Sequence, residues 1–103
     1  MKVEWTLLAE SERDKIAEYI LDSFGVKSMK KFIQEVRKTT KMLRNNPDIA
    51  PKDPLFEDRS DTYRSVLINN LSKLVYRVDG ETIYVVGFWD CRSDSEAQAK
   101  RVK

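Results

Sequence analysis

The 103-residue sequence predicts a single α+β domain, residues 1–103, in which an N-terminal strand and an antiparallel helix hairpin precede a three-stranded antiparallel meander. Three observations lead to this order. Apolar and polar residues alternate at the start of the chain, apolar residues recur at helical spacing between residues 11 and 46, and β-forming runs fill residues 63–90. The order β-α-α-β-β-β places both helices on one face of the sheet.

The first strand is predicted over residues 2–7, where polar and apolar side chains alternate. Ser11 is expected to cap the first helix, because a serine hydroxyl accepts a hydrogen bond from an amide of the first turn. Apolar residues then follow at helical spacing up to Phe24. Gly25 supplies the left-handed residue that ends this helix.

A second helix is predicted to begin at Ser28 and to end at Asn45-Asn46-Pro47. Between residues 27 and 44 the chain carries one acid, Glu35, and seven bases: Lys27, Lys30, Lys31, Arg37, Lys38, Lys41 and Arg44. The net charge of the whole chain is only +2, so the bases are concentrated here. This segment indicates either an anionic partner or an ordinary solvated helix face.

The meander follows a proline-containing loop over residues 49–62. Its strands are predicted over residues 63–69, 72–78 and 82–90, with turns at Asn69-Asn70 and Asp79-Gly80. The last residues, 93–103, are expected to form a short helix or a frayed tail.

Pairing across a two-residue Asp79-Gly80 turn assigns the side chains to two faces of the sheet. The face toward the helices is expected to hold Leu67, Leu74, Tyr76, Ile83, Val85 and Trp89. The other face is expected to hold Arg64, Lys73, Arg77, Tyr84, Phe88 and Asp90, alongside Val66, Val75 and Val86. Such an apolar and basic patch usually marks an interaction site, so a partner is expected to cover it.

Several functions are disfavoured by residues that the sequence lacks. There is no histidine and only one cysteine, so we expect neither a metal site nor an internal disulfide. There is no glycine-rich phosphate loop, and no cofactor is expected. A single cysteine and no apolar membrane-spanning stretch favour a cytoplasmic protein without membrane contact.

The order of these elements and four segments resemble the RelE/ParE superfamily, the toxins of type II toxin–antitoxin pairs. The segments are VEWTLLAESERDKIAEYILDSFG, YRS, KLVYRVDGETIYVV and FWDCRSDSE. They match the family's opening strand and helix, its Arg-bearing strand, its basic-Leu-Val-Tyr strand and its closing aromatic-x-x-Arg segment. The resemblance covers Val3 to about Ala97 and implies a growth-inhibiting toxin in a hetero-oligomer with a cognate antitoxin.

The resemblance also implies catalytic residues, if this chain is like the family's ribosome-dependent mRNA endonucleases. Arg64, Lys73 and Arg92 match basic positions of those enzymes, and cations there stabilise the phosphate during attack by a ribose 2′-oxygen. Asp90, or Glu57 as an alternative, is the expected proton acceptor. Alanine at Lys73 or Arg92 is expected to leave the fold nearly intact, because exposed charges contribute little to stability.

Arg77, Tyr84 and Phe88 are expected to contact the antitoxin or a nucleic acid. The expected function is that of an mRNA endonuclease that acts on the ribosome. Two alternatives stay open: a ParE-type inhibitor that binds DNA gyrase, and an inactive module that only binds a partner. Many members of the family carry a histidine or tyrosine in the C-terminal segment, and this chain has neither after Tyr84.

Overall fold

The computed structural model describes residues 1–103 and confirms the predicted order of strands and helices. The elements are β1 (Lys2–Trp5), α1 (Leu7–Phe24), α2 (Val26–Asn45), the 3₁₀ turn η1 (Pro54–Phe56), β2 (Tyr63–Ile68), β3 (Ser72–Asp79), β4 (Thr82–Asp90) and α3 (Ser95–Arg101). No helix is long and apolar enough to cross a membrane.

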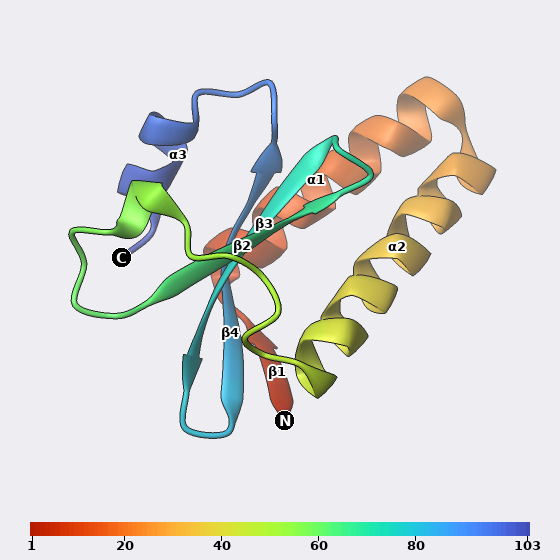
Figure 1. Cartoon of the computed structure of the whole chain (residues 1–103). Helices are drawn as coiled ribbons and strands as arrows, with labels where there is room; N and C mark the ends of the chain where they lie inside the picture. The colour runs from red at the N-terminus through yellow and green to blue at the C-terminus, as the bar shows by residue number, and fades with distance from the viewer.

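The four strands form one mixed sheet in the order β1-β4-β3-β2. β1 runs parallel to β4, and the other two pairs are antiparallel. α1 and α2 cover one face, whereas α3 and the η1 segment lie on the other side of the sheet (Figure 1). We call these the hairpin face and the outer face.

Both helices of the hairpin begin earlier than the sequence patterns indicate. Thr6 caps α1, since its hydroxyl accepts a hydrogen bond from the Ala9 amide at 3.2 Å, and Ser11 therefore lies inside the helix. Gly25, at φ +94°, ends α1 and directly precedes α2, which begins at Val26 rather than Ser28. No connecting loop separates the two helices.

The connection between β2 and β3 has three residues, because Ile68 pairs with Ser72. Asn69 and Asn70 both adopt positive φ, at 54° and 56°. Compared with a two-residue turn, the additional residue exchanges the two faces for every side chain of β2 relative to β3. Arg64 therefore pairs with Tyr76 on the hairpin face, and the expectation that it shares a face with Lys73 is wrong.

A β-bulge interrupts the pairing of β3 with β4. Tyr76 pairs with Val85 but Val75 pairs with Gly87, so Val86 is an extra residue on β4. Beyond a bulge the alternation of faces is inverted. Phe88 consequently packs in the core under the hairpin, and Trp89 packs on the outer face, the reverse of the expected arrangement. Asp90 follows Phe88 to the hairpin face.

Glu12 of α1 supports the bulged segment. Its carboxylate accepts a hydrogen bond from the Phe88 amide at 3.4 Å, and the residue is only 9% exposed. Burial raises the pKa of Glu12, and the hydrogen bond from Phe88 opposes that rise. Glu12 is therefore an acidic residue of α1 with a structural role in the core.

The outer face is covered by the protein's own chain. Val75 and Val86 are buried beside Phe56, Ala99 and Val102, so the expectation of an open apolar patch is wrong. The C-terminal segment covers this face as a helix, because Asp94 caps α3 by accepting hydrogen bonds from two amides.

Arg59 fastens α3 to the η1 loop. Its guanidinium donates hydrogen bonds to the carbonyl oxygens of Val102 and Ala99, at 2.5 and 2.8 Å. It also lies over the rings of Phe56 and Tyr63, at 4.8 and 5.4 Å from the ring centroids. The loop and the C-terminal helix therefore form one cover for the outer face.

Candidate functional site

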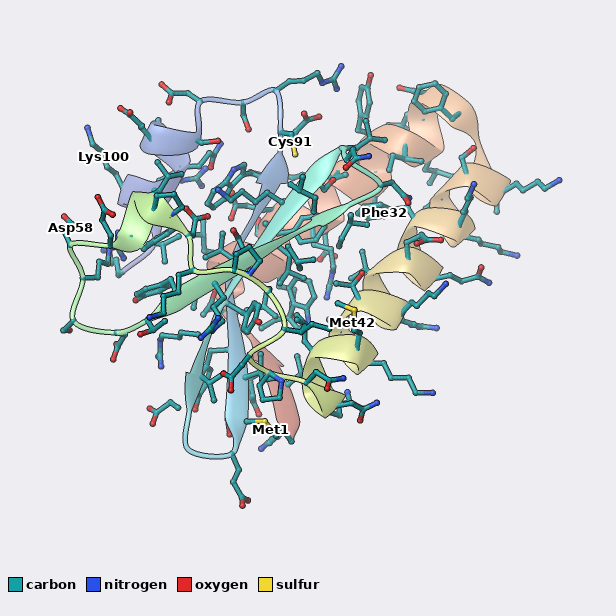
Figure 2. The ribbon with its side chains drawn as sticks, viewed as in Figure 1. Met1, Phe32, Met42, Asp58, Cys91 and Lys100 are labelled. Carbon is teal, nitrogen blue, oxygen red and sulfur yellow. The ribbon has the colours of Figure 1, made fainter.

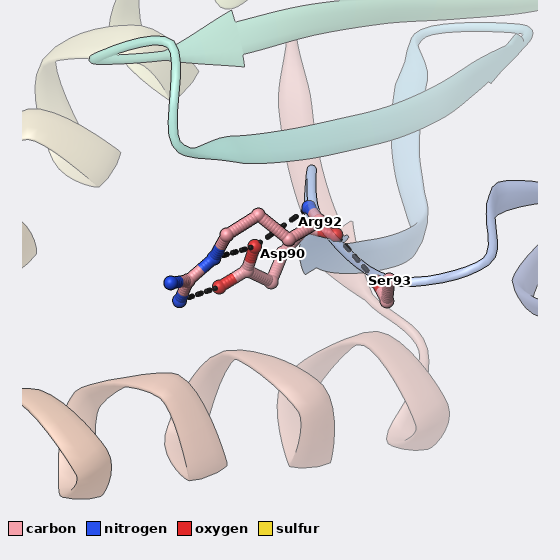
Figure 3. Close-up of polar contacts among 3 residues, drawn as sticks. All are labelled: Asp90, Arg92 and Ser93. Atoms are coloured by element: carbon pink, nitrogen blue, oxygen red, sulfur yellow. Dashed lines mark hydrogen bonds and ion pairs between the residues drawn. The ribbon is translucent and has the colours of Figure 1, made fainter.

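The residues expected to form one site occur at three separate locations. The first is the end of β4, where Asp90 and Arg92 form a bidentate pair beside α1 (Figure 3). The Arg92 Nε and Nη2 atoms donate to the two carboxylate oxygens at 3.1 and 2.9 Å, and the Arg92 amide adds a bond of 2.8 Å. The Ser93 hydroxyl donates to the Asp90 carbonyl, which closes the turn.

The pair fixes the charge state of both side chains. The hydrogen bonds from Arg92 hold the pKa of Asp90 below its ordinary value, and Asp90 in turn raises the pKa of Arg92. Asp90 is therefore a carboxylate at neutral pH, and a weak base. The Arg92 side chain is 78% exposed and lies open to a partner.

The second location is the outer face, where Lys73 lies between two elements of the cover. Its Nζ atom is 2.5 Å from Oδ2 of Asp53, whose side chain is completely buried, and Lys73 itself is only 18% exposed. The ammonium also lies 5.7 Å from the centroid of the Trp89 ring. Lys73 thus forms a buried ion pair.

Besides its ion pair with Lys73, Asp53 has two structural roles at this place. Its carboxylate caps η1 by accepting a hydrogen bond from the Leu55 amide at 2.9 Å, and its own amide donates to the Tyr63 carbonyl. Burial by itself raises the pKa of Asp53, but the hydrogen bonds from Lys73 and Leu55 outweigh burial, and the pKa lies below its ordinary value. This residue was not among those singled out in the sequence. An Asp directly before a proline is a typical helix cap, and this signal was available.

The third location is the hairpin face near the end of α2. Arg64 donates a hydrogen bond of 2.8 Å to the Ala50 carbonyl, and only 22% of its side chain is exposed. Tyr76, its partner across the strands, donates to the Pro47 carbonyl at 2.7 Å. Together these two side chains hold the loop that follows α2.

The expected binding residues are divided between the surface and the core. Arg77 lies over the ring of Tyr84, 4.7 Å from its centroid, on the outer face beside the end of α3. Phe88 is fully buried, so it is not part of a binding surface. Glu57, the alternative proton acceptor, is exposed in the loop after η1.

Direct contact within the expected catalytic set exists between Asp90 and Arg92 alone. Arg64 and Lys73 lie on opposite faces of the sheet. No group of three or more acidic or cysteine side chains is placed to hold a metal ion. The arrangement offers exposed cations for binding, and each carboxylate near Lys73 or Arg92 already has a cationic partner.

The family described as the ParE toxin of the type II toxin–antitoxin system parDE matches residues 3–95. A solved structure described as the chromosomal ParDE toxin–antitoxin system from P. aeruginosa has the same fold, with a TM-score of 0.70 at 19% identity. The alignment covers 87% of this chain and 95% of that chain. No curated protein matches the sequence.

The family match extends over nearly the whole chain, from β1 to the start of α3. It confirms the resemblance that the four sequence segments indicated. The chain therefore belongs to the ParE toxin family, and it is a toxin of a type II toxin–antitoxin pair whose partner is a cognate antitoxin.

Proposed function

We propose that this toxin inhibits DNA gyrase by binding it and does not cleave mRNA. The observation that carries the proposal is the buried ion pair between Lys73 and Asp53. Because the carboxylate of Asp53 offsets the positive charge of Lys73, the pair attracts a phosphate only weakly, and the ammonium is held away from solvent. Lys73 would have to leave Asp53 unpaired before it could act in a cleavage reaction, which is costly.

The other expected catalytic groups support the same choice. Ribonucleolytic attack by a 2′-oxygen needs cations on the phosphate and benefits from a group that accepts the proton. Arg64 binds backbone carbonyls on the opposite face of the sheet, and Asp90 is paired with Arg92, which lowers its pKa. A toxin that acts by binding needs none of these groups to meet at one point.

The cations that reach the surface are then the groups that contact the protein target or the antitoxin: Arg92, which is largely exposed, and Arg77, whose side chain is 26% exposed. Arg92 projects from the end of β4, and Arg77 lies with Tyr84 on the outer face. Arginine beside an aromatic ring is frequent at protein interfaces, because it combines charge with a flat apolar surface. We assign these residues to binding and not to catalysis.

Two assays on the purified protein test the proposal. In a supercoiling assay with purified gyrase and relaxed plasmid, the toxin is expected to inhibit supercoiling and to accumulate double-strand breaks. In a purified translation system, primer extension is expected to reveal no toxin-dependent cleavage of mRNA. Cleavage on the ribosome without gyrase inhibition would refute the proposal.

Asp90→Asn provides a matched variant, since it keeps the size of the side chain and removes its charge. Under the proposal the variant still inhibits gyrase when it is folded, because Asp90 accepts no proton in the mechanism. Folding is checked by circular dichroism. Normal growth of cells that contain the folded parent protein would instead identify an inactive module that binds the antitoxin.

A further inference from the structure

The outward face of α2 carries a concentration of charge that the proposed function does not use. Seven bases of this helix are solvent-exposed: Lys27, Lys30, Lys31, Arg37, Lys38, Lys41 and Arg44. None of the seven forms an ion pair, although seven ion pairs occur elsewhere in the protein. The whole chain has a net charge of only +2, so acids elsewhere compensate for a strongly positive α2.

Helical geometry places all seven bases on one side. At 3.6 residues per turn they fall within an arc of roughly 140°, and they extend along roughly 26 Å of the axis. They form two adjacent rows. One row holds Lys27, Lys31 and Lys38, and the other holds Lys30, Arg37, Lys41 and Arg44. The one acid of the helix, Glu35, lies outside this arc.

The opposite side of α2 is committed to the core through Phe32, Val36 and Leu43. The helix lies at the margin of the molecule, and no other element crosses its outward side (Figure 1). Figure 2 shows Phe32 directed toward the sheet and long nitrogen-tipped side chains directed away from it. The two rows are therefore carried on a helix whose orientation is fixed by packing.

We propose that the basic face of α2 binds the phosphate backbone of double-stranded DNA. An α-helix with its side chains is about 10–12 Å wide, and the major groove is about 12 Å wide. A helix along the groove meets a sugar-phosphate strand on each side, and the two rows of bases face these two strands. Binding of this kind depends on charge and carries no sequence preference.

The composition of the face favours a duplex over the other anionic partners. Proteins that bind single strands stack bases on aromatic side chains, and the aromatic residue of α2, Phe32, is buried. Peptide partners of helices are anchored by apolar side chains. The large apolar residues of α2 that are exposed, Val26 and Met42, lie at the margins of the arc.

The proposal goes beyond gyrase inhibition, and its test contains no gyrase. Fluorescence anisotropy with the full chain and a labelled duplex of about 20 base pairs measures binding between about 50 and about 200 mM salt. The logarithm of the binding constant is expected to fall linearly with the logarithm of salt concentration. A triple variant, Lys31→Gln, Lys38→Gln and Lys41→Gln, is expected to bind at least about tenfold more weakly, with a slope that is smaller by about 2.7, or about 0.9 for each lost phosphate contact.

The matched control removes three exposed lysines that lie outside α2: Lys52→Gln, Lys100→Gln and Lys103→Gln. It changes the net charge equally and is expected to keep the slope and nearly the whole affinity. Equal loss in both triple variants would overturn the proposal, as would no binding to the duplex at about 50 mM salt. Equal or tighter binding of a single strand, or of a poly-glutamate peptide, would also overturn it. All variants are exposed-surface changes, and circular dichroism verifies that they fold.

Discussion

Replacement of Lys73 separates a structural from a catalytic role for this residue. Lys73→Ala removes the only cation that contacts the fully buried Asp53 carboxylate. Removing one partner of a buried pair typically costs about 3–5 kcal/mol, because the other charge remains buried without compensation. The expectation that alanine here leaves the fold intact rested on an exposed lysine, and the structure contradicts that premise. We expect Lys73→Ala to lower the free energy of unfolding by about 3–5 kcal/mol.

Urea unfolding followed by tryptophan fluorescence measures this loss, since Trp89 lies beside the pair. Lys73→Met serves as a second variant, because it keeps most of the aliphatic stem and removes only the charge. The double variant Lys73→Met, Asp53→Asn removes both charges and is expected to be less destabilised than the sum of its two single changes. This positive coupling is the signature of the ion pair.

Arg92→Ala is the matched control for a cation that pairs with an aspartate at the surface. Its side chain is largely exposed, so we expect its unfolding curve to remain close to that of the parent. The reasoning is refuted if Lys73→Met is as stable as Arg92→Ala. A catalytic role would then explain any loss of toxicity in Lys73 variants, and a folding defect would not.

Three further predictions concern the outer face. The pKa of Asp53 is lowered by folding, so the contribution of Asp53 to stability is present above about pH 4 and is lost as the pH falls further through the folded pKa. Asp53→Asn is expected to flatten this part of a plot of unfolding free energy against pH. An unchanged slope would contradict the prediction. Gly87→Ala would place a Cβ atom 2.6 Å from Trp89 Cζ3 and 3.3 Å from Val102 Cγ2. We expect the substitution to lower the free energy of unfolding, measured in urea, by about 1–3 kcal/mol and to shift the tryptophan emission to the red. Parent-like stability and emission would show that Trp89 and Val102 can move aside without cost. Arg59→Ala removes the hydrogen bonds to the carbonyls of Ala99 in α3 and of Val102 directly after it, and is expected to speed amide exchange in α3 and not in β3. Uniform exchange rates, or no change, would argue against Arg59 as the fastening residue.

The order of the elements was predictable from local patterns. The period-two and helical patterns of apolar residues each involve residues that are only a few positions apart in the chain. These patterns identified β1, both hairpin helices and the meander. Gly25 and the asparagines before Pro47 marked the helix ends for the same reason. The family resemblance rested on the order of short segments and was confirmed by the match over residues 3–95.

The placement of side chains on the two faces was not predictable, because it depends on single-residue shifts. The apolar run Val85 to Trp89 is buried on both faces, so its composition contains no alternation that would reveal the bulge at Val86. A third loop residue after Asn70 similarly moved Arg64 to the hairpin face. The bulge inverts the faces of the residues that follow it in β4, and the extra loop residue inverts the faces of β2 relative to β3.

The sequence by itself determined the fold class, the toxin family and the basic character of α2, since these depend on composition and on spacing along the chain. The tertiary structure alone decided which charges are free. It joined Lys73 to Asp53, 20 positions earlier in the chain, and left the bases of α2 without acidic partners. Whether a cation has an acidic partner depends on distances of a few ångströms, and the packing of remote segments sets those distances.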